Sequence, residues 1–502
     1  MTKKLLLIAV LCLTHLILAA QDWSIHYIGE YPIGRTHFND GIVDGDGVTF
    51  LAGFEGPNID TPDALFMRIE PDGSHSEFKY QKDGYRSKAT CLIEMPNENL
   101  FAAGNLYGDT VDDVMVWILD KQLNVLEEKH YKKEIEGNSF GASKVTLDSH
   151  AHVILSTCVQ QNNTYQGFDY RGVFFKFDQH GDSISHRYLV QDYPTPVFFL
   201  MDFRVRQMWY QAEEEELLCL APGYGNVMSF ITFDSAFNYI DEYQIWQDDI
   251  EKTDHTINRD CFTDHWYNED EALFFSSHGD ADHNRLRISR INTHGEYLDF
   301  IRLNERTDTI DDAATNRCMA TANDSTFYFS FYYHIWGKYP GFACVYMLND
   351  QMEIIGRHID DDHKCYRSSL ILPTSDGGCI TVNDSCQYGP ISTTSRPIIN
   401  KLNRSDFETV TLSTSDICPE PLRNKAYPNP CEETLHIPLP DIKGIIIRCL
   451  LLDNHGRTIV DRSVLSSDRT LDLNVSKLKK GIYHYQIYSD KETLLTGSFI
   501  KE

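Results

Sequence analysis

The stretch LFMRIEPDGSHSEFKY at residues 65–80 decides the fold, because versions of it recur along most of the chain. It joins an alternating apolar run to a second strand-like run through a tight polar turn, which is the pattern of a β-hairpin. A period of roughly 55 residues is typical of solenoids and propellers. The apolar residue that precedes the turn recurs at Ile69, Leu119, Phe177, Phe233, Ile291, Leu348 and Leu402.

Each repeat contains two further strand-like runs ahead of this hairpin, such as ATCLIEM at 89–95 and NLFAAG at 99–104. Helix-period apolar patterns are nearly absent. We therefore predict an all-β chain with a seven-bladed β-propeller of four-stranded antiparallel blades over residues 21–415. An array of β-sandwiches is the alternative. The early run WSIHYIGEY at 23–31 resembles a fourth strand, and we expect it to close the ring on the last blade, whose own hairpin extends to residue 413.

The first 20 residues combine two lysines, an apolar stretch and a small-residue end, so they predict a signal peptide. A membrane anchor is the alternative, but the apolar run is short and interrupted by Thr14 and His15. No later stretch has about 18 consecutive apolar residues, so we predict no transmembrane segment after signal removal.

The net charge is −29; the leader contributes +2 and the tail from Pro419 about +1, so the repeats carry about −32. The negative electrostatic potential of so acidic a protein excludes nucleic acid as the expected partner and favours cations or basic partners. The alternative is that the acidic residues only keep an exported protein soluble.

Thirteen cysteines include Cys12 of the leader. Export permits disulfides, and the nearest candidate pairs are Cys379 with Cys386 and Cys418 with Cys431. Several others lie in strand-like runs, where cysteine behaves as a small buried hydrophobe. Their spacings do not fit a zinc site.

The blade connections and the links between second and third strands lie at one end of an antiparallel meander. They are long and varied here, as in EGPNIDTPDA, VQQNNTYQGFDYR, SHGDADHN and YYHIWGKYPG. Variable loops on a rigid scaffold are where binding functions concentrate. We therefore place the candidate site at this end.

A spacing D-x4-R recurs at this end, with comparable arginines at Arg35 and Arg86. One hypothesis is a ring of guanidinium groups that binds a carboxylate or sulfate ligand. The other is that each arginine pairs with the aspartate five residues earlier and fastens one blade to the next. The three pairs are Asp254 with Arg259, Asp312 with Arg317, and Asp362 with Arg367.

Aromatic residues at the same end, among them Tyr107, Trp336 and Tyr339, suit stacking on sugars or peptides, or simply pack on one another. Two acidic loops offer oxygen ligands for calcium, but neither matches an EF-hand, and most acidic loops of this kind are only solvated. Their candidate ligands are Asp280, Asp282, Asp360 and Asp362.

The motifs HExxH, a P-loop and GxGxxG are absent from the sequence. We therefore predict a binding or adhesion module for a glycan, peptide or host protein. A glycan hydrolase or lyase at the channel mouth and a structural surface-layer scaffold are the alternatives. Carboxylates or histidines close together in the channel would favour the enzyme. An aromatic patch would favour the binding module, and a fully ion-paired face would favour the scaffold.

Residues 416–426 form a proline-containing linker, and residues 427–502 a separate short-stranded β-domain. The order of its motifs resembles the type A C-terminal sorting domain of the type IX secretion system. This resemblance implies a small immunoglobulin-like β-sandwich that engages the secretion machinery, directs translocation across the outer membrane and is commonly removed. The cargo is then attached to surface lipopolysaccharide or released. The motif residues are Tyr427, Pro428, Asn429, Pro430, Gly456, Gly481 and Tyr483.

Overall fold

The computed structural model shows strands almost throughout, and in the part it describes no helix is long and apolar enough to cross a membrane. The residues described are 22–27, 29–30, 35–57, 61–107, 112–132, 138–163, 167–189, 205, 207–222, 228–245, 256–257, 271–280, 283–292, 297–302, 309–313, 317–322, 326–335, 338–351, 353–360, 366–386, 395–409, 431, 433–438, 446–453, 457–465, 470–488 and 493–501.

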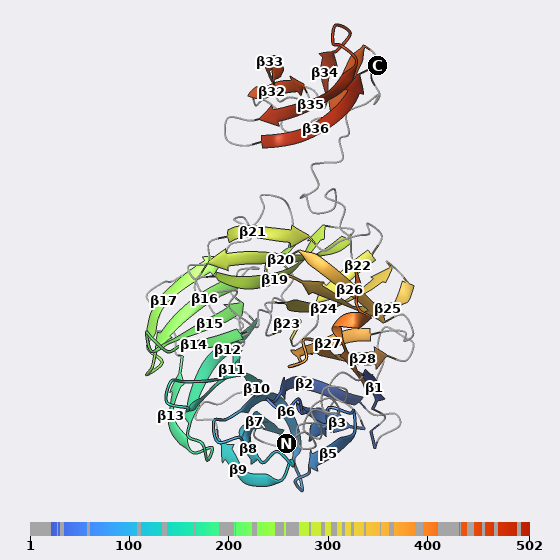
Figure 1. Ribbon diagram of the computed structural model, residues 1–502. Coiled ribbons are helices and arrows are strands. Elements are labelled where there is room, and N and C mark those ends of the chain that lie inside the picture. Colours follow the sequence, from blue (N-terminus) through green and yellow to red (C-terminus); the bar gives the residue numbers. More distant parts are fainter. Residues whose placement is uncertain are drawn as a thin grey trace, which may run out of the picture. The chain divides into compact units, whose positions relative to one another are not determined.

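Within the described residues the strands before residue 410 group into seven antiparallel blades, so the propeller prediction is confirmed (Figure 1). Blade 1 contains β2 (Arg35–Val43), β3 (Thr49–Gly56), β4 (Asp63–Ile69) and β5 (His75–Tyr80). Blade 2 contains β6 (Arg86–Glu94), β7 (Leu100–Tyr107), β8 (Asp112–Leu119) and β9 (Val125–Tyr131). Blade 3 contains β10 (Asn138–Leu147), β11 (Val153–Asn163), β12 (Gly167–Phe177) and β13 (Ser183–Tyr188).

Blade 4 contains β14 (Gln207–Gln211), β15 (Glu216–Pro222), β16 (Met228–Asp234) and β17 (Tyr239–Ile245). Blade 5 contains β18 (Thr256–Ile257), β19 (Glu271–Asp280), β20 (His283–Asn292) and β21 (Tyr297–Arg302). Blade 6 contains β22 (Thr309–Ala313), β23 (Met319–Thr321), β24 (Phe327–Ile335), β25 (Lys338–Leu348) and β26 (Ile354–Asp360). Blade 7 contains β27 (Tyr366–Pro373), β28 (Cys379–Cys386) and β29 (Ser395–Leu402).

The N-terminal strand β1 (Trp23–His26) closes the ring, as the sequence predicted. It pairs antiparallel with β29, from Trp23 opposite Lys401 to His26 opposite Ile398, and so becomes the outer strand of blade 7. The chain beyond β1 is then fastened to blade 1, because buried Glu55 accepts hydrogen bonds from the Tyr27 hydroxyl (3.1 Å) and the Glu30 amide (2.6 Å) and pairs with Lys79 (2.9 Å).

The expected hairpin from β29 to residue 413 is wrong. After β29 the chain forms one short 3-10 turn, η1 (Arg404–Asp406), and then β30 (Glu408–Thr409). β30 pairs with β26 on the outer edge of blade 6, where Gly356 lies opposite Thr409. Because β1 already covers the outer edge of β29, the chain leaves blade 7 and covers the neighbouring edge instead.

Three connections predicted as long loops are instead extensions of the second and third strands. VQQNNTYQGFDYR, SHGDADHN and YYHIWGKYPG lie mostly within the pairs β11–β12, β19–β20 and β24–β25. Aromatic and other strand-favouring residues continue through two of these stretches, which allows the ladder of backbone hydrogen bonds to extend.

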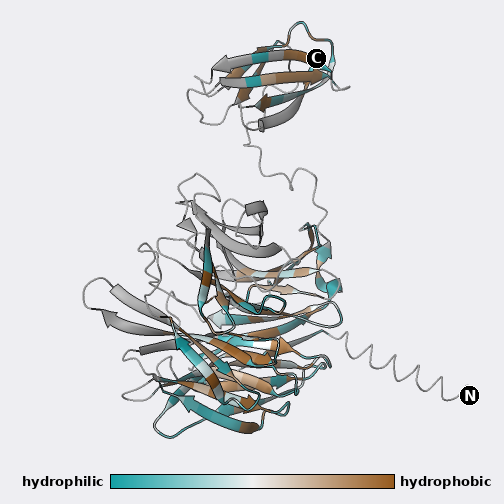
Figure 2. Ribbon diagram, turned by 90° about the vertical axis from the view of Figure 1, so that its left-hand side faces the viewer, coloured by the Kyte–Doolittle hydropathy of each residue, from teal (hydrophilic) through white to brown (hydrophobic). Residues whose placement is uncertain are grey.

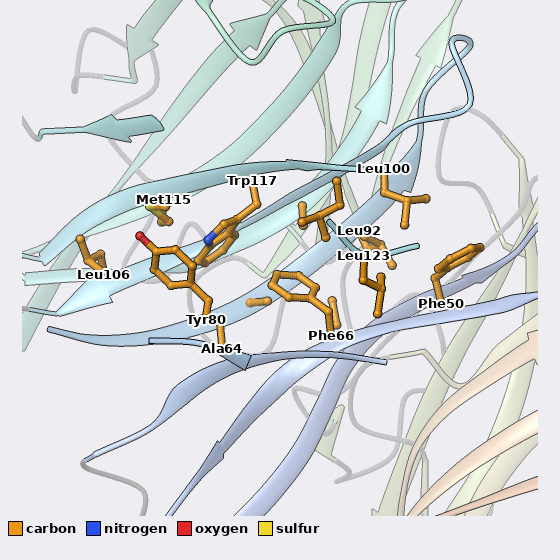
Figure 3. Close-up of a cluster of buried hydrophobic side chains, with 14 of the residues drawn as sticks. Phe50, Ala64, Phe66, Tyr80, Leu92, Leu100, Leu106, Met115, Trp117 and Leu123 are labelled. Carbon is orange, nitrogen blue, oxygen red and sulfur yellow. The ribbon is translucent and has the colours of Figure 1, made fainter. Parts of the chain in front are cut away.

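The hydrophobic core lies between neighbouring blades. In the cluster between blades 1 and 2, Phe66 and Tyr80 approach the fully buried Trp117 edge-on, each with a ring-centroid distance of 5.4 Å (Figure 3). Such aromatic pairs contribute about 0.5–1.5 kcal/mol beyond their buried area. Hydrophobic residues accordingly run along the sheets, whereas the outer strands β5, β9 and β13 expose mostly polar side chains (Figure 2).

One turn design recurs where the first strand of a blade leads into the second and the third into the fourth. This is the end of the blades opposite to the connections between second and third strands. An aspartate or asparagine accepts the amide protons two and four residues later, as Asp120 does from Gln122 and Asn124. The fourth residue of the turn has positive φ, which glycine adopts without strain. Glycine is present at Gly47 and Gly181, but Leu123, Ala151 and Phe237 adopt this conformation at φ 64°, 64° and 62°. Leu123 and Phe237 are buried between blades.

Residues 412–502 form a second compact unit. It contains the pair β31 (Thr434–Pro438) and β34 (Thr470–Asn474) and a four-stranded sheet with the order β33-β32-β35-β36. One hydrophobic cluster joins residues of both sheets, including Leu435, Leu473 and Cys449. The strands of the larger sheet are β32 (Ile446–Asp453), β33 (Thr458–Leu465), β35 (Gly481–Tyr488) and β36 (Thr493–Lys501).

The bridge between Cys418 and Cys431 stays a prediction, because Cys418 lies outside the described residues; Cys431 is fully buried in the core of the second unit. The candidate bridge between Cys379 and Cys386 is wrong. Cys379 is free and buried. It begins β28 and Cys386 ends that strand, a separation of roughly 23 Å, which is far beyond the reach of a disulfide.

Candidate functional site

The first strands of neighbouring blades lie next to one another, β2 beside β6 and β27, and β10 beside β6 and β14. They are therefore the inner strands of the ring. Each begins at the end of its blade where the second strand leads into the third. We call this end the entrance, and it is where the sequence placed the candidate site.

Arg86 and Tyr107 are both at the entrance, directly opposite each other at the ends of β6 and β7. Arg35 occupies the equivalent position of blade 1, opposite Gly56 at the end of β3. The prediction that Arg35 and Arg86 are comparable is therefore consistent with the strand register.

Arg367 and Arg317 occupy other positions. Arg367 lies opposite Asp384, the third-last residue of its second strand, whereas Arg317 pairs outside the strands with Leu370 of β27. A single ring of equivalent arginines is therefore not what the register shows. Arg259 lies outside the described residues, as do Asp254 and Asp362.

Arg317 joins three blades through its contacts. Its backbone amide donates to Ser369 of blade 7 (3.1 Å), and its guanidinium donates to the Gly41 carbonyl of blade 1 (3.0 Å) and lies 3.6 Å from Asp40. Asp40 also accepts the amide protons of Gly41 (2.9 Å) and of Leu92 in blade 2 (3.0 Å). The side chain of Asp312, the predicted partner, lies outside what the structure describes.

The register reveals a second set of basic residues, two of which the sequence analysis missed. His37, Lys88 and Arg367 each lie opposite the third-last residue of the second strand, in blades 1, 2 and 7. The D-x4-R spacing finds Arg367 but not His37 and Lys88, because these two are not arginine. Aligning the repeats on their second strands would have found all three.

Two of these basic residues contact the preceding blade at equivalent positions. The His37 Nδ1 atom lies 2.7 Å from Oδ2 of Asp384, whose side chain is only 5% exposed. The Lys88 ammonium lies 4.6 Å from the ring centroid of Phe54 and 5.7 Å from that of Tyr107. Because His37 also packs against Phe54 (5.8 Å), the four side chains form a continuous row.

The other predicted site residues are only partly described. Trp336, Asp282 and the motif residues 427–430 and Gly456 lie outside the described residues. Tyr339 and Asp280 lie in β25 and β19, and nothing further is described of their side chains. Asp360 accepts a hydrogen bond from Asn400 (3.4 Å). Among the described residues no three His, Cys, Asp or Glu side chains form a group suited to a metal ion.

In the second unit, Gly481 begins β35 with extended backbone, and the Tyr483 hydroxyl donates to the Lys479 carbonyl (2.9 Å). The Tyr483 ring stacks on Phe499 at 5.7 Å between ring centroids. Two motif residues of the tail therefore serve its packing.

Residues 425–502 match the family described as the secretion system C-terminal sorting domain. The resemblance inferred from the sequence is thus confirmed: this chain is a β-propeller protein with a type IX sorting domain, which indicates export to the cell surface or the extracellular space and contact with the secretion machinery. No curated protein sequence matches the chain.

The solved structures that are similar to the chain include the following three. An acylaminoacyl peptidase of Pyrococcus horikoshii is 11% identical to this chain, and the alignment covers 82% of this chain and 58% of the peptidase with a TM-score of 0.40. The β-propeller domain of the Trilobed protease from Pyrococcus furiosus has 11% identity, 78% and 98% coverage and a TM-score of 0.40. A puromycin hydrolase has 10% identity, 85% and 60% coverage and a TM-score of 0.48. The chain thus spans less than two thirds of the peptidase and the hydrolase.

Proposed function

We propose that the chain is an exported binding protein whose propeller holds a ligand at the entrance. The observation that carries this proposal is the row of His37, Phe54, Lys88 and Tyr107, which places basic side chains and aromatic rings together on the first two strands of blades 1 and 2. The strand extensions of blades 3, 5 and 6 leave from the same end. Basic side chains beside aromatic rings are suited to binding a ligand, and they do not by themselves indicate a catalytic reaction.

The proposed processing fits this function. The signal peptide would cover residues 1–20, the propeller 21–415, the linker 416–426 and the sorting domain 427–502. β1 begins at Trp23, so removal of the leader would leave the strand that closes the ring intact. The immunoglobulin-like character of the tail also belongs to this proposal.

A glycan hydrolase or lyase is the second candidate, favoured by the hydrogen-bonded pair of His37 and Asp384. A histidine held by a buried carboxylate is an arrangement that general base catalysis uses. The same pair also joins blades 7 and 1, which is a sufficient reason for its presence.

The test uses the exported protein, incubated with a panel of polysaccharides and peptides. Binding is followed by calorimetry, and products are followed by reducing ends and by absorbance of unsaturated sugars. We expect saturable binding without product. Product that grows with protein concentration and disappears in His37→Ala would establish the enzyme instead, and absence of binding to the entire panel would refute the binding proposal.

A further inference from the structure

We propose that the entrance of blades 1 and 2 binds an acidic polysaccharide, one whose sugars carry carboxylate or sulfate groups; this inference rests on the proposed binding function. We define the entrance patch as Arg35, His37, Tyr85, Arg86, Lys88 and Tyr107. Its positive charge, its aromatic surface and an unsatisfied donor support this proposal in turn.

The first step is the concentration of positive charge within an acidic protein. The chain has a net charge of −29, yet Arg35, Arg86 and Lys88 lie near the starts of two adjacent inner strands. Arg86 and Lys88 are two residues apart on β6, so their side chains leave the same face of the strand about 6.6 Å apart. Because the net charge of the protein disfavours long-range attraction of any polyanion, recognition of an anionic group depends on this local cluster of cations.

The second step is the aromatic surface next to these cations. Tyr107 lies directly opposite Arg86, and Tyr85, which is 44% exposed, directly precedes it. The ammonium of Lys82 lies 6.0 Å from the Tyr85 ring centroid. Tyrosine presents an apolar face and a hydroxyl, a combination suited to the C–H face and the hydroxyl groups of a sugar.

The third step is a donor without an acceptor. The Nε–H group of Arg35 is buried and has no hydrogen-bond partner among the described residues. Buried polar groups are nearly always satisfied, and each exception needs an explanation. A movement of the Arg35 side chain on binding would let a carboxylate or sulfate oxygen of the ligand accept this proton in a charge-assisted hydrogen bond.

The experiment measures binding of the full exported protein to polygalacturonate, heparin and neutral dextran at low and moderate salt. Lys88→Met removes the charge but keeps an unbranched chain against Phe54, and Arg86→Gln removes the neighbouring charge. Tyr85→Ser removes the exposed aromatic face. Lys129→Met is the matched control, because Lys129 pairs with Asp182 in a turn at the opposite end of blade 3.

We expect at least one acidic polysaccharide to bind, with polygalacturonate and heparin distinguishing carboxylate from sulfate recognition. Lys88→Met and Arg86→Gln should each weaken binding about tenfold or more, and Lys129→Met should leave it unchanged. Dextran should not bind. Equal binding of dextran, or parental affinity in both Lys88→Met and Arg86→Gln, would overturn the site. Binding of peptides alone would overturn the ligand class and leave the binding function standing, whereas failure of every ligand would refute both.

Discussion

Asp148→Asn tests how much a single buried carboxylate contributes to blade 3. Oδ1 of Asp148 accepts the amide protons of His150 (2.9 Å) and His152 (2.8 Å), which forms the turn before β11. Its Oδ2 lies 2.7 Å from the Lys176 ammonium and 3.0 Å from His152 Nδ1. The carboxylate is fully buried, and the variant keeps an oxygen for the turn but loses the charge.

The magnitude follows from the pKa of Asp148. Burial raises this pKa, but hydrogen bonds from Lys176 and His152 outweigh burial and lower it from 3.8 to about 2. Each pKa unit corresponds to about 1.4 kcal/mol. Because His152 is 31% exposed and water screens part of the interaction, we expect the variant to lose about 1–2 kcal/mol of unfolding free energy at pH 7.

The sign of the pH dependence is fixed by the direction of the shift. The folded-state pKa lies below the unfolded value, so the stabilisation is complete above about pH 5 and is lost as the pH falls through 2. At pH 3 the difference between parental protein and variant should be about half of its value at pH 7.

Urea unfolding of the propeller at pH 7 and pH 3 measures this difference. Asp120→Asn is the control, because Asp120 forms the same turn but its second oxygen accepts from the neutral Asn124 amide. The control should lose less stability than Asp148→Asn. Equal losses in the two variants, or a deficit of Asp148→Asn that does not change with pH, would refute the role given to Lys176.

Three further predictions concern the ring, a turn and the tail. Arg317→Ala should lower the unfolding free energy by about 1 kcal/mol without changing ligand affinity, because Asp40 keeps two amide donors. Parental stability combined with lost affinity would instead support the ring of guanidinium groups that binds an acidic ligand. Glu98→Gly should raise the urea midpoint by an amount equivalent to about 0.5 kcal/mol, since φ is 66° there, whereas Glu98→Ala should not. Deleting residues 420–502 should stop the protein in the periplasm, and normal amounts at the surface by immunoblotting of cell fractions would contradict the sorting role.

The repeats could be predicted because each blade carries its own turn and strand signals. The residues before each turn set the strand register, and the N-terminal strand could be matched to a missing outer strand. The path after β29 could not be predicted, since the segment 406–413 has a strand pattern and only the occupied edge of β29 diverts it to blade 6.

Only some of the residues that lie at the entrance could be predicted from the sequence. Arg86 and Tyr107 are at the entrance, whereas Arg317 lies deeper, beside a bulge between Phe38 and Asp40 of β2. Such bulges shift the register by one residue and leave no mark in the spacing of charged residues. Lys88 and His37 were missed because their roles depend on contacts with the preceding blade.

The closing strand makes the order of synthesis matter. His26 pairs with Ile398, so 372 residues separate the two partners along the chain. Bringing the ends of such a segment together costs about 5 kcal/mol of chain entropy before the pairing repays it. Blades 1 to 6 contain pairings within their own sequence, and we expect them to form while the last blade is still being delivered. A nascent chain therefore remains an open arc with two unpaired edges, and those edges are the surfaces that periplasmic chaperones would have to shield until residues 395–402 arrive.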